Sequence, residues 1–402
     1  MSARGHSRLR RLAASINESL LRAWLEPLLA GLPGAALFDA HTHIGANDPD
    51  GASLTREQLV DILAPLDARG VVFAMHEPGG YREANDHILE EAARSDGRLV
   101  PFCRLDPNHG AVAEAARCVE LGARGIKLHP RSDGFVMGSP EARDVFEFAG
   151  AHRLPVLVHA GRGIPALGRH TLEYSEQFPD ARIILAHAAV SDLSWIWRQM
   201  PDHPNVFIDT SWWVPVDLTF LFSCVPPGQI LFASDVPYGA PALNAILTMR
   251  CGLQAGLSPD QLIAVCGAQL ERLLAGEDPI DLGPAPGPRD AGRDLVLERV
   301  YLYAMVALGR MIAGAPADEI IALAELAASV EEDAPQAAAC LTLRELIGLQ
   351  VEAIAEVGAK DLATPSTQRL ALLSPLLLAA TLAATPDVPA PQGSPVGGAT
   401  ST

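Results

Sequence analysis

The feature that most constrains the fold of this chain is a unit that recurs between residues 36 and 277. Each unit opens with a short apolar run that ends in a polar or charged residue, and a stretch of helical composition follows. Successive runs start 24 to 35 residues apart, which is the size of one strand plus one helix. The eight apolar runs span residues 36–45, 71–78, 98–107, 123–131, 154–161, 181–189, 205–212 and 230–237.

The segments between the runs carry helix-start signals. Thr55 precedes a periodic apolar stretch and is expected to be its N-cap residue. Ser139 is followed by Pro140, and Ser258 by Pro259, which is the order favoured at an N-cap and the first helical position. The sequence therefore predicts helices that alternate with the apolar strands.

Continuous apolar strands that alternate with amphipathic helices indicate a parallel sheet covered on both faces. Eight such units over about 240 residues match a closed barrel, typically about 250 residues long, better than an open sheet. An open doubly wound sheet would be expected to carry a glycine-rich phosphate loop after its first strand, and the segment GANDPDG has no such motif. The predicted fold class is α/β: a (β/α)8 TIM barrel with an N-terminal helix and a C-terminal all-helical extension.

The chain outside the predicted barrel (36–277) divides into four segments. In residues 1–35, an amphipathic helix that docks on the barrel is predicted by the helical spacing of Leu9, Leu12, Ile16, Leu20 and Trp24. A Pro/Gly-rich linker is expected at 278–294, a helical extension at 295–384 and a disordered tail at 385–402. We interpret the extension as a cap or an oligomerisation module, through which the chain could form a homo-oligomer.

Composition argues against two classes of main partner, and we expect a small-molecule substrate instead. The formal net charge is −18, which argues against nucleic acid and anionic membrane surfaces. The longest apolar stretch, around residues 370–384, contains Ser374 and Pro375 and is shorter than the roughly 20 residues of a membrane span. The six cysteines show no C-x₂-C pairing and are expected to be buried, reduced thiols of a cytoplasmic protein.

Residue types that bind metals gather at the ends of the apolar runs. The first run ends in His41 and His43, and alternate strand residues face the same way, so both imidazoles are expected in the barrel mouth. His159, His187 and Asp235 end the fifth, sixth and eighth runs. Catalytic groups of such barrels sit at the carboxyl ends of the strands, and two buried imidazoles are costly without a coordinated or hydrogen-bonded group between them. We interpret this set as a metal site.

The sequence resembles the amidohydrolase superfamily in the segments FDAHTHIG, GIKLHPR, VLVHAG, ILAHAA and LFASDVPYG. The likeness is to the amidohydrolase-related branch of TIM-barrel, metal-dependent hydrolases and decarboxylases, and it covers residues 36–277. The resemblance implies a divalent metal, with Zn²⁺ the expected ion, bound by His41, His43, His159 and Asp235.

The resemblance also implies roles in catalysis. The metal would lower the pKa of a bound water to about 7. Asp235 would accept the proton of that water and pass it to the leaving group. His187 would hydrogen-bond the water and the developing oxyanion, or else ligate a second metal. Asp39 could orient an imidazole or simply form hydrogen bonds at the end of its strand.

Lys127, in the fourth run, bears on the number of metal ions. In binuclear members of the superfamily a lysine at the fourth strand is carboxylated and bridges two ions, which would place His159 and His187 on the second ion. In the branch that this chain resembles the site is commonly mononuclear, and we predict one ion. Lys127 would then remain an ammonium that neutralises a substrate carboxylate or donates to an oxyanion.

Further residues at the strand ends could bind the substrate. Together with Lys127, three arginines could hold a carboxylate or phosphate, or they could form salt bridges at the barrel rim. These arginines are Arg104, Arg131 and Arg162. The aromatic residues that could wall the pocket, or else pack in the core, are Trp212, Trp213 and Tyr238.

Three functions are compatible with this site. The predicted one is a metal-dependent hydrolase that cleaves a C–N or C–O bond (an amide, lactone or ester) of a small, anionic substrate. The alternative enzyme is a metal-dependent, non-oxidative decarboxylase of an aromatic or enoic acid, whose carboxylate the basic residues would orient. The third function is that of an inactive metal-binding scaffold, although a scaffold has no need to keep Asp235.

Overall fold

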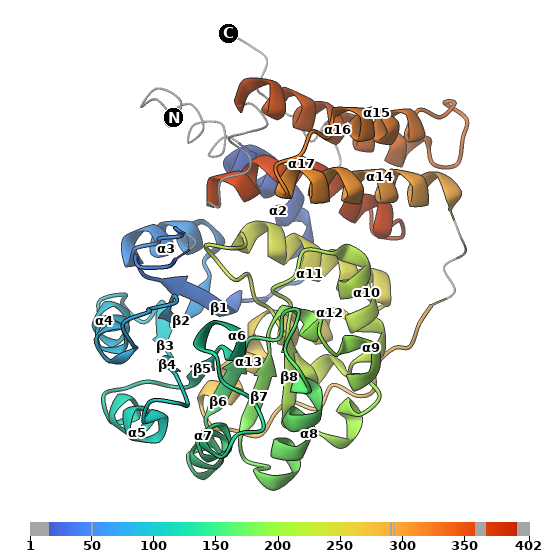
Figure 1. Ribbon diagram of the computed structural model, residues 1–402. Coiled ribbons are helices and arrows are strands. Elements are labelled where there is room, and N and C mark those ends of the chain that lie inside the picture. The colour runs from blue at the N-terminus through green and yellow to red at the C-terminus, as the bar shows by residue number, and fades with distance from the viewer. Residues whose placement is uncertain (1–15, 50, 290–291, 293, 358–366, 392–402) are drawn as a thin grey trace.

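The computed structural model describes residues 16–49, 51–289, 292, 294–357 and 367–391. Within them the chain forms a barrel of parallel strands surrounded by helices, and the C-terminal part forms a separate helical layer (Figure 1). The strands are β1 (Phe38–Ile44), β2 (Arg69–Ala74), β3 (Leu99–Pro101), β4 (Cys103–Leu105), β5 (Ile126–Leu128), β6 (Pro155–Val158), β7 (Arg182–Leu185), β8 (Val206–Asp209) and β9 (Ile230–Leu231).

The strands fall in the eight predicted apolar runs and close into a cylinder. β1, β2 and β3 pair in parallel, as do β4 to β9 in order. β3 and β4 are two halves of one strand position, because the intervening Phe102 donates its N–H to Val72 of β2 (2.9 Å). The ring closes just past β9, where the N–H of Asp235 donates to the carbonyl of His41 in β1 (2.8 Å). The predicted (β/α)8 barrel is confirmed.

Helices cover the outside of the barrel and begin where the sequence predicts. Thr55 and Ser258 form capping boxes, and Ser139 accepts the N–H of Ala142, so three predicted N-caps are confirmed. The helices of the barrel are α3 (Arg56–Leu63), α4 (Arg82–Ala93), α5 (Ala111–Glu120), α6 (Pro130–Asp133), α7 (Pro140–Ala151), α8 (Leu167–Gln177), α9 (Leu193–Ile196), α10 (Pro215–Cys224), α11 (Pro241–Ala255), α12 (Pro259–Ile263) and α13 (Gln269–Leu274).

An inner apolar core fills the barrel and sets the direction of the residues above it. Its members include Phe102, Leu157, Phe207 and Ala233, one from each of four strand positions. Alternate residues of a strand face the same side, so the residue two positions after each of these also faces inward. Those positions, at the carboxyl ends of the strands, are Arg104, His159, Asp209 and Asp235.

β1 departs from simple alternation. Phe38 and Ala40 belong to the inner core, yet the imidazoles of His41 and His43, which have the opposite parity, lie at the barrel mouth. The register of β1 against β2 shifts between Asp39 and Thr42. A one-residue irregularity of this kind reverses which side chains face inward, and such bulges are common next to active sites.

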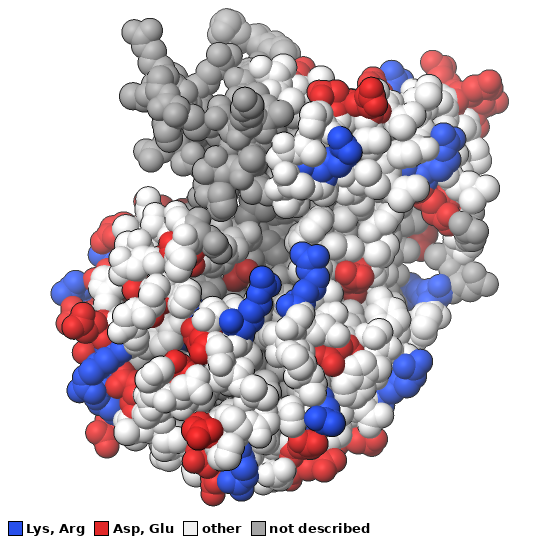
Figure 2. Space-filling view, viewed as in Figure 1, with Lys and Arg blue, Asp and Glu red and all other residues white. Residues whose placement is uncertain are grey.

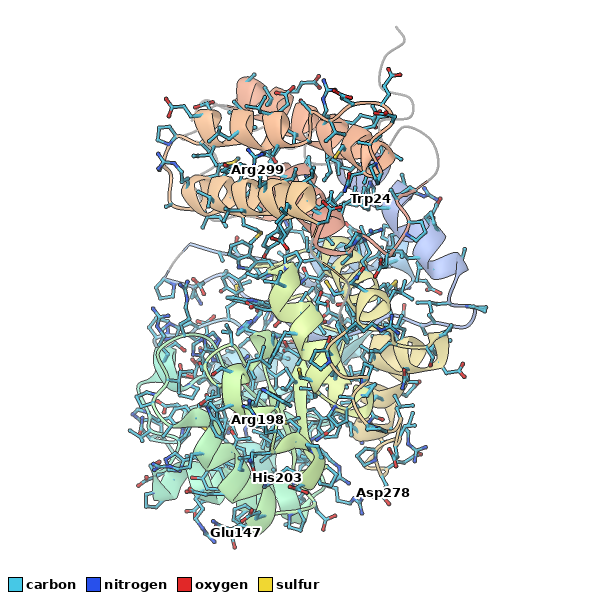
Figure 3. The ribbon with its side chains drawn as sticks, turned by 90° about the vertical axis from the view of Figure 1, so that its right-hand side faces the viewer. Trp24, Glu147, Arg198, His203, Asp278 and Arg299 are labelled. Atoms are coloured by element: carbon cyan, nitrogen blue, oxygen red, sulfur yellow. The ribbon has the colours of Figure 1, made fainter. Side chains whose placement is uncertain are left out.

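The C-terminal helices pack on the flank of the barrel. They rest on α10, α11 and the N-terminal segment formed by η1 (Ile16–Leu21) and α2 (Arg22–Ala30) (Figure 1). Leu20 and Trp24 are buried in this segment, and Figure 3 shows Trp24 between the helical layer and the barrel. The predicted apolar positions Leu9 and Leu12 lie outside the described residues. The layer consists of α14 (Leu295–Ile312), α15 (Asp318–Ala327), α16 (Ala337–Val357) and α17 (Thr367–Ala384).

The segment after α17 corrects one prediction. A disordered tail is predicted from residue 385, but the first residues are held by the buried guanidinium of Arg250 on α11. Arg250 donates to the hydroxyl and carbonyl of Thr385 and to the carbonyls of Val388 and Pro389, at 2.7 to 3.2 Å. A buried cation needs acceptors, and this need fixes a segment whose composition is otherwise typical of disorder. Residues 392–402 lie outside the described part of the chain.

The predictions about the cysteines and about membrane-spanning segments can be compared with the structure. All six cysteines are free and buried, as expected. Among the residues that the structure describes, no helix has both the length and the apolar character that crossing a bilayer demands.

Candidate metal centre

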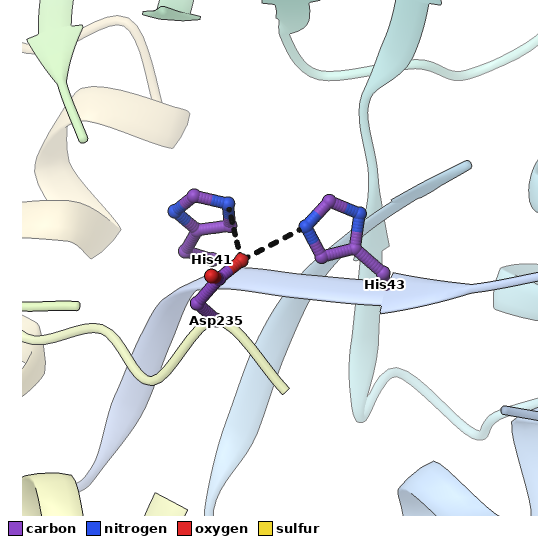
Figure 4. A group of neighbouring side chains, drawn as sticks. All are labelled: His41, His43 and Asp235. Atoms are coloured by element: carbon purple, nitrogen blue, oxygen red, sulfur yellow. Dashed lines mark hydrogen bonds and ion pairs between the residues drawn. The ribbon is translucent and has the colours of Figure 1, made fainter. Parts of the chain in front are cut away.

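Three predicted ligands meet at the mouth of the barrel. Oδ1 of Asp235, just past β9, lies 3.0 Å from Nε2 of His41 and 3.1 Å from Nε2 of His43 (Figure 4). The donor atoms of the three residues lie within 4.8 Å of one another. Two ligands in a tetrahedral zinc site, each about 2.0 Å from the ion, are roughly 3.3 Å apart. The observed spacing is therefore close to that of ligands sharing one ion.

The distribution of protons at these atoms also fits a metal. Nδ1 of His41 lies 2.9 Å from Oδ2 of Asp209, and a carboxylate only accepts, so Nδ1 carries the proton. A neutral imidazole has one N–H, so Nε2 of His41 presents a lone pair to Asp235. Two such atoms 3.0 Å apart repel each other unless a cation lies between them or the ring takes a second proton. A set of imidazole and carboxylate donors of this kind fits a divalent metal such as zinc.

His159 joins the centre through His187. Nδ1 of His159 lies 2.9 Å from Nε2 of His187, and it is not among the three donors that lie within 4.8 Å of one another. Nδ1 of His187 lies 3.0 Å from the carbonyl oxygen of Ser211 and donates to it, which leaves Nε2 as an acceptor. His187 also approaches the second oxygen of Asp235, at 4.0 Å. The ligand role of His159 stays a prediction.

Two of these side chains belong to residues whose backbone is strained. The φ angle is +64° at Asp235 and +58° at His187, and Ala188 and Ala189 follow with +55° and +50°. This left-handed conformation costs roughly 1–2 kcal/mol for each residue with a side chain. Such strain persists only where surrounding contacts over-determine it, and it gathers at functional sites.

Lys127 is fully buried in β5 and faces the centre. Its Nζ lies 3.2 Å from Nε2 of His41 and 4.8 Å from the centroid of the Phe73 ring. Burial lowers the pKa of Lys127 to about 7. Burial and Lys127 also disfavour a proton on His41, but the carboxylates of Asp235 and Asp209 outweigh them and raise its pKa. A carboxylated Lys127 and a second ion stay an alternative prediction.

The other groups have pKa values that suit metal binding. Burial lowers the pKa of His43 to about 3 and also lowers the pKa values of His187 and His159. Burial opposes ionisation of Asp235, but His41 and His187 outweigh it and hold the pKa of this carboxyl well below its usual range. Neutral imidazoles and an ionised carboxylate are the forms in which these side chains ligate a metal.

The predicted cluster of arginines is not assembled around the centre. The buried guanidinium of Arg104 donates to the carboxylate of Asp133 (3.2 Å) and to the hydroxyl of Ser132 (2.6 Å). Arg131 and Arg162 are exposed. Arg104 thus forms a salt bridge, which is the second of the two roles predicted for the arginines, and its guanidinium is not free to bind an anion.

The predicted aromatic residues separate into two groups. The ring of Tyr238 stands edge-on to His43, with 5.4 Å between the ring centroids, so Tyr238 lies against the centre. Trp212 donates from Nε1 to Asp217 of α10 (2.8 Å) and packs beside Trp213, 6.0 Å away. The substrate-binding role of Trp212 stays a prediction.

A cavity of about 1460 Å³ opens at the strand ends, and none of the four predicted metal ligands lines it. It reaches the strand ends at Ile44, Gly45 and Arg104, and α3, α4 and α5 contribute to its walls. Figure 2 shows charges of both signs on the edge of the molecule that these helices form. The acidic residues in the lining outnumber the arginines, so its charge does not favour an anion. The charged lining residues are Arg56, Arg82, Arg104, Glu57, Glu77, Glu83, Glu91, Asp106, Glu114 and Asp133.

Asp209 is a residue at this centre that the sequence reasoning missed. It ends β8, is fully buried, and contacts Nδ1 of His41 at 2.9 Å. A signal was present in the sequence, since Asp209 directly follows the apolar residues 206–208 of the seventh run. Of the two roles predicted for Asp39, the structure shows hydrogen bonding at the end of its strand. Its Oδ1 accepts the backbone N–H groups of His41 (3.0 Å) and Ser234 (2.9 Å).

Comparison with known proteins places the barrel of this chain in a sequence family. Residues 38–268 match the sequence model of a family described as amidohydrolase. No curated protein matches the chain at a significant level. Among solved structures, a protein described as amidohydrolase II is 20% identical, with a TM-score of 0.47 over 60% of this chain and 99% of its own. A 2,6-dihydroxybenzoate decarboxylase from Rhizobium is 16% identical, with a TM-score of 0.47 over 60% of this chain and 98% of its own. A 5-carboxyvanillate decarboxylase from Sphingomonas paucimobilis is 16% identical, with a TM-score of 0.46 over 60% of this chain and 99% of its own.

Proposed function

Because this chain belongs to the amidohydrolase family, we propose that it is a metal-dependent hydrolase that cleaves a C–N or C–O bond of a small molecule. The bond would be that of an amide, a lactone or an ester. The observation that carries the proposal is the approach of one carboxylate oxygen of Asp235 to Nε2 of His41 and of His43, at 3.0 and 3.1 Å. Buried imidazole and carboxylate donors at this spacing favour a divalent cation.

The side chains at the centre would each have a defined task. His41, His43 and His159 would hold one zinc ion together with Asp235. When bound, the metal would supply hydroxide at neutral pH and polarise the scissile carbonyl. Asp235 would take a proton from the attacking water and return it to the leaving group. The single N–H of neutral His187 donates to the carbonyl of Ser211, so His187 would hydrogen-bond the developing oxyanion only after Nε2 takes a second proton.

The surroundings of the centre favour hydrolysis over decarboxylation. A decarboxylase must hold the carboxylate that it removes, and of the four predicted cations only Lys127 is buried at the centre without a carboxylate in hydrogen-bond contact. Arg104 pairs with Asp133, and the other two predicted arginines are exposed. The anionic character of the substrate therefore depends on Lys127. A cytoplasmic location and self-association through the helical extensions remain predictions.

A substrate screen with metal analysis tests the proposal. Purified protein is loaded with zinc and assayed against lactones, amides and esters beside aromatic and enoic acids. Cleavage that disappears with a chelator and returns with zinc would support the hydrolase. Release of CO₂ from an acid would contradict it in favour of the decarboxylase. Stoichiometric zinc without turnover of any of these classes would favour the inactive scaffold.

A further inference from the structure

We propose that Asp209 is a positioning residue that fixes the protonated nitrogen of His41 and thereby sets the metal affinity of the centre. The inference rests on the proposed function, because it concerns the same metal. Asp209 ends β8 and has no exposed surface, and its position two residues after Phe207 turns its carboxylate into the barrel mouth. It touches a predicted ligand without being one of the three convergent donors.

One oxygen of Asp209 serves His41. Oδ2 lies 2.9 Å from Nδ1 of His41, and both side chains are almost fully buried, so water does not compete for this bond. The carboxylate accepts the Nδ1 proton, which leaves Nε2 of His41 as the lone-pair donor that a metal requires. With the proton on Nε2 instead, His41 would point an N–H at the position of the ion.

The other oxygen of Asp209 serves the turn that carries His187. Oδ1 accepts the backbone N–H groups of His187 and Ser211, each at 2.9 Å, and the hydroxyl of Ser211 at 2.5 Å. His187 begins the run of three residues with left-handed backbone, which needs such contacts to persist. The two oxygens thus have separate tasks, one toward an imidazole and one toward the backbone.

This separation makes the Asp209→Asn variant informative. Its amide oxygen can keep the Oδ1 position, because the three groups there are all donors. The amide NH₂ then occupies the Oδ2 position and faces Nδ1 of His41. Two donors cannot pair, so Nδ1 is forced to accept and the proton moves to Nε2. The variant keeps the shape of the site while it reverses the tautomer of one ligand.

Asp39→Asn is the matched control. Asp39 is buried to the same degree, and its Oδ1 also accepts two backbone N–H groups, including that of His41. Its hydrogen bonds involve no imidazole nitrogen among the described contacts. A carboxylate-to-amide change at position 39 therefore tests burial and strand pairing without addressing the tautomer.

The experiment measures zinc affinity by calorimetry and the His41 tautomer by ¹⁵N NMR of the metal-free protein at pH 9. We expect a Nδ1–H tautomer in the wild type, a Nε2–H tautomer in Asp209→Asn, and zinc affinity about 10- to 100-fold weaker in that variant. The melting temperature in the presence of a chelator should change little. Asp39→Asn should keep the wild-type tautomer and lose at most a few-fold in affinity.

Several outcomes would overturn the inference. Equal zinc affinity in the wild type and Asp209→Asn would do so, as would equal losses in both variants. A Nε2–H tautomer in the wild type, which is measurable even if Asp209→Asn fails to fold, would also contradict it. A wild-type protein that binds no zinc but shows the Nδ1–H tautomer would instead count against the proposed function and leave the assigned hydrogen bond supported.

Discussion

Asp235 is the predicted ligand that could also move a proton. One oxygen contacts the Nε2 atoms of His41 and His43, while the other lies 4.0 Å from His187. Asp235→Asn keeps an oxygen that can bind a metal but removes the base, so we expect zinc to be retained while turnover falls by on the order of 10²–10⁴. Zinc content and kcat measured on the same preparation check this. Loss of zinc together with turnover would contradict the proton-transfer role.

Lys127 bears on whether the centre would bind one ion or two. It is fully buried, and its Nζ lies 3.2 Å from Nε2 of His41. Methionine is similarly long and unbranched, so Lys127→Met should fold with little change in packing. If Lys127 remains an ammonium, the variant should bind the same single equivalent of zinc as the wild type, measured by elemental analysis. A fall from two equivalents to one would show that a carboxylated Lys127 is a ligand.

A residue of the centre could be predicted from the sequence where the evidence for its role lies within its own segment. His41, His43 and Asp235 were predicted because each is a metal-ligand type at the end of an apolar run. Asp209 lies at an equivalent position, but its role depends on the imidazole of His41, which is 168 residues away in the chain. A partner at that distance is defined only once the barrel is closed, so the sequence alone could not assign it.

Among the elements, the contact between α4 and α5 has a pH dependence of its own. Burial opposes ionisation of Glu114 on α5, but hydrogen bonds from Arg117, Asn85 and Cys118 outweigh it and lower its pKa to about 2. Arg82 also lies 3.5 Å from this carboxylate. Because the pKa is lower in the folded than in the unfolded chain, the stabilisation is complete above about pH 4.5 and is lost as the pH falls toward 2.

A comparison of the wild type with Glu114→Gln isolates this effect from other titrating groups. We expect the variant to be less stable at pH 6 in urea unfolding, because a neutral amide replaces a charged acceptor of four hydrogen bonds. The difference in unfolding free energy should shrink between pH 4.5 and pH 3. A difference that stays constant over this range would mean that Glu114 is not ionised with a depressed pKa.

The elements themselves were well marked in the sequence, and the local irregularities were not. Apolar runs and Ser-Pro starts predict strands and helices because these signals act over a few residues. The register shift in β1 between Asp39 and Thr42 depends on pairing with β2 and with the end of the last strand. Such a shift depends on neighbouring strands that are remote in the chain. The alternation of apolar and polar residues within the segment could therefore not reveal it.

At the scale of the whole molecule, the centre is a product of barrel closure. Asp39 in β1 accepts the N–H of Ser234, 195 residues later, beside the bond from Asp235 to the carbonyl of His41. The same few hydrogen bonds that join the first and last strand positions therefore bring the ligand pair of β1 to the carboxylate past β9. Partial opening of this seam would separate His41 and His43 from Asp235.

The C-terminal end of the described chain is tied to this barrel through Arg250. Its guanidinium is buried, burial lowers its pKa to about 10, and its four hydrogen bonds all go to residues 385–389. Deletion of residues 385–402 would leave a buried cation without these acceptors, which typically costs on the order of 3 kcal/mol. We therefore expect a clear drop in the melting temperature of the truncated protein in calorimetry.

Two further variants separate this cause from a general effect of shortening the chain. Deletion of residues 392–402 keeps every acceptor of Arg250 and should lower the melting temperature less. Arg250→Met removes the cation, so combining it with the longer deletion should recover part of the lost stability, because the unpaired charge is then gone. If the longer deletion left the melting temperature unchanged, or if Arg250→Met worsened it further, the contact between Arg250 and the C-terminal segment would not be what holds that segment to the barrel.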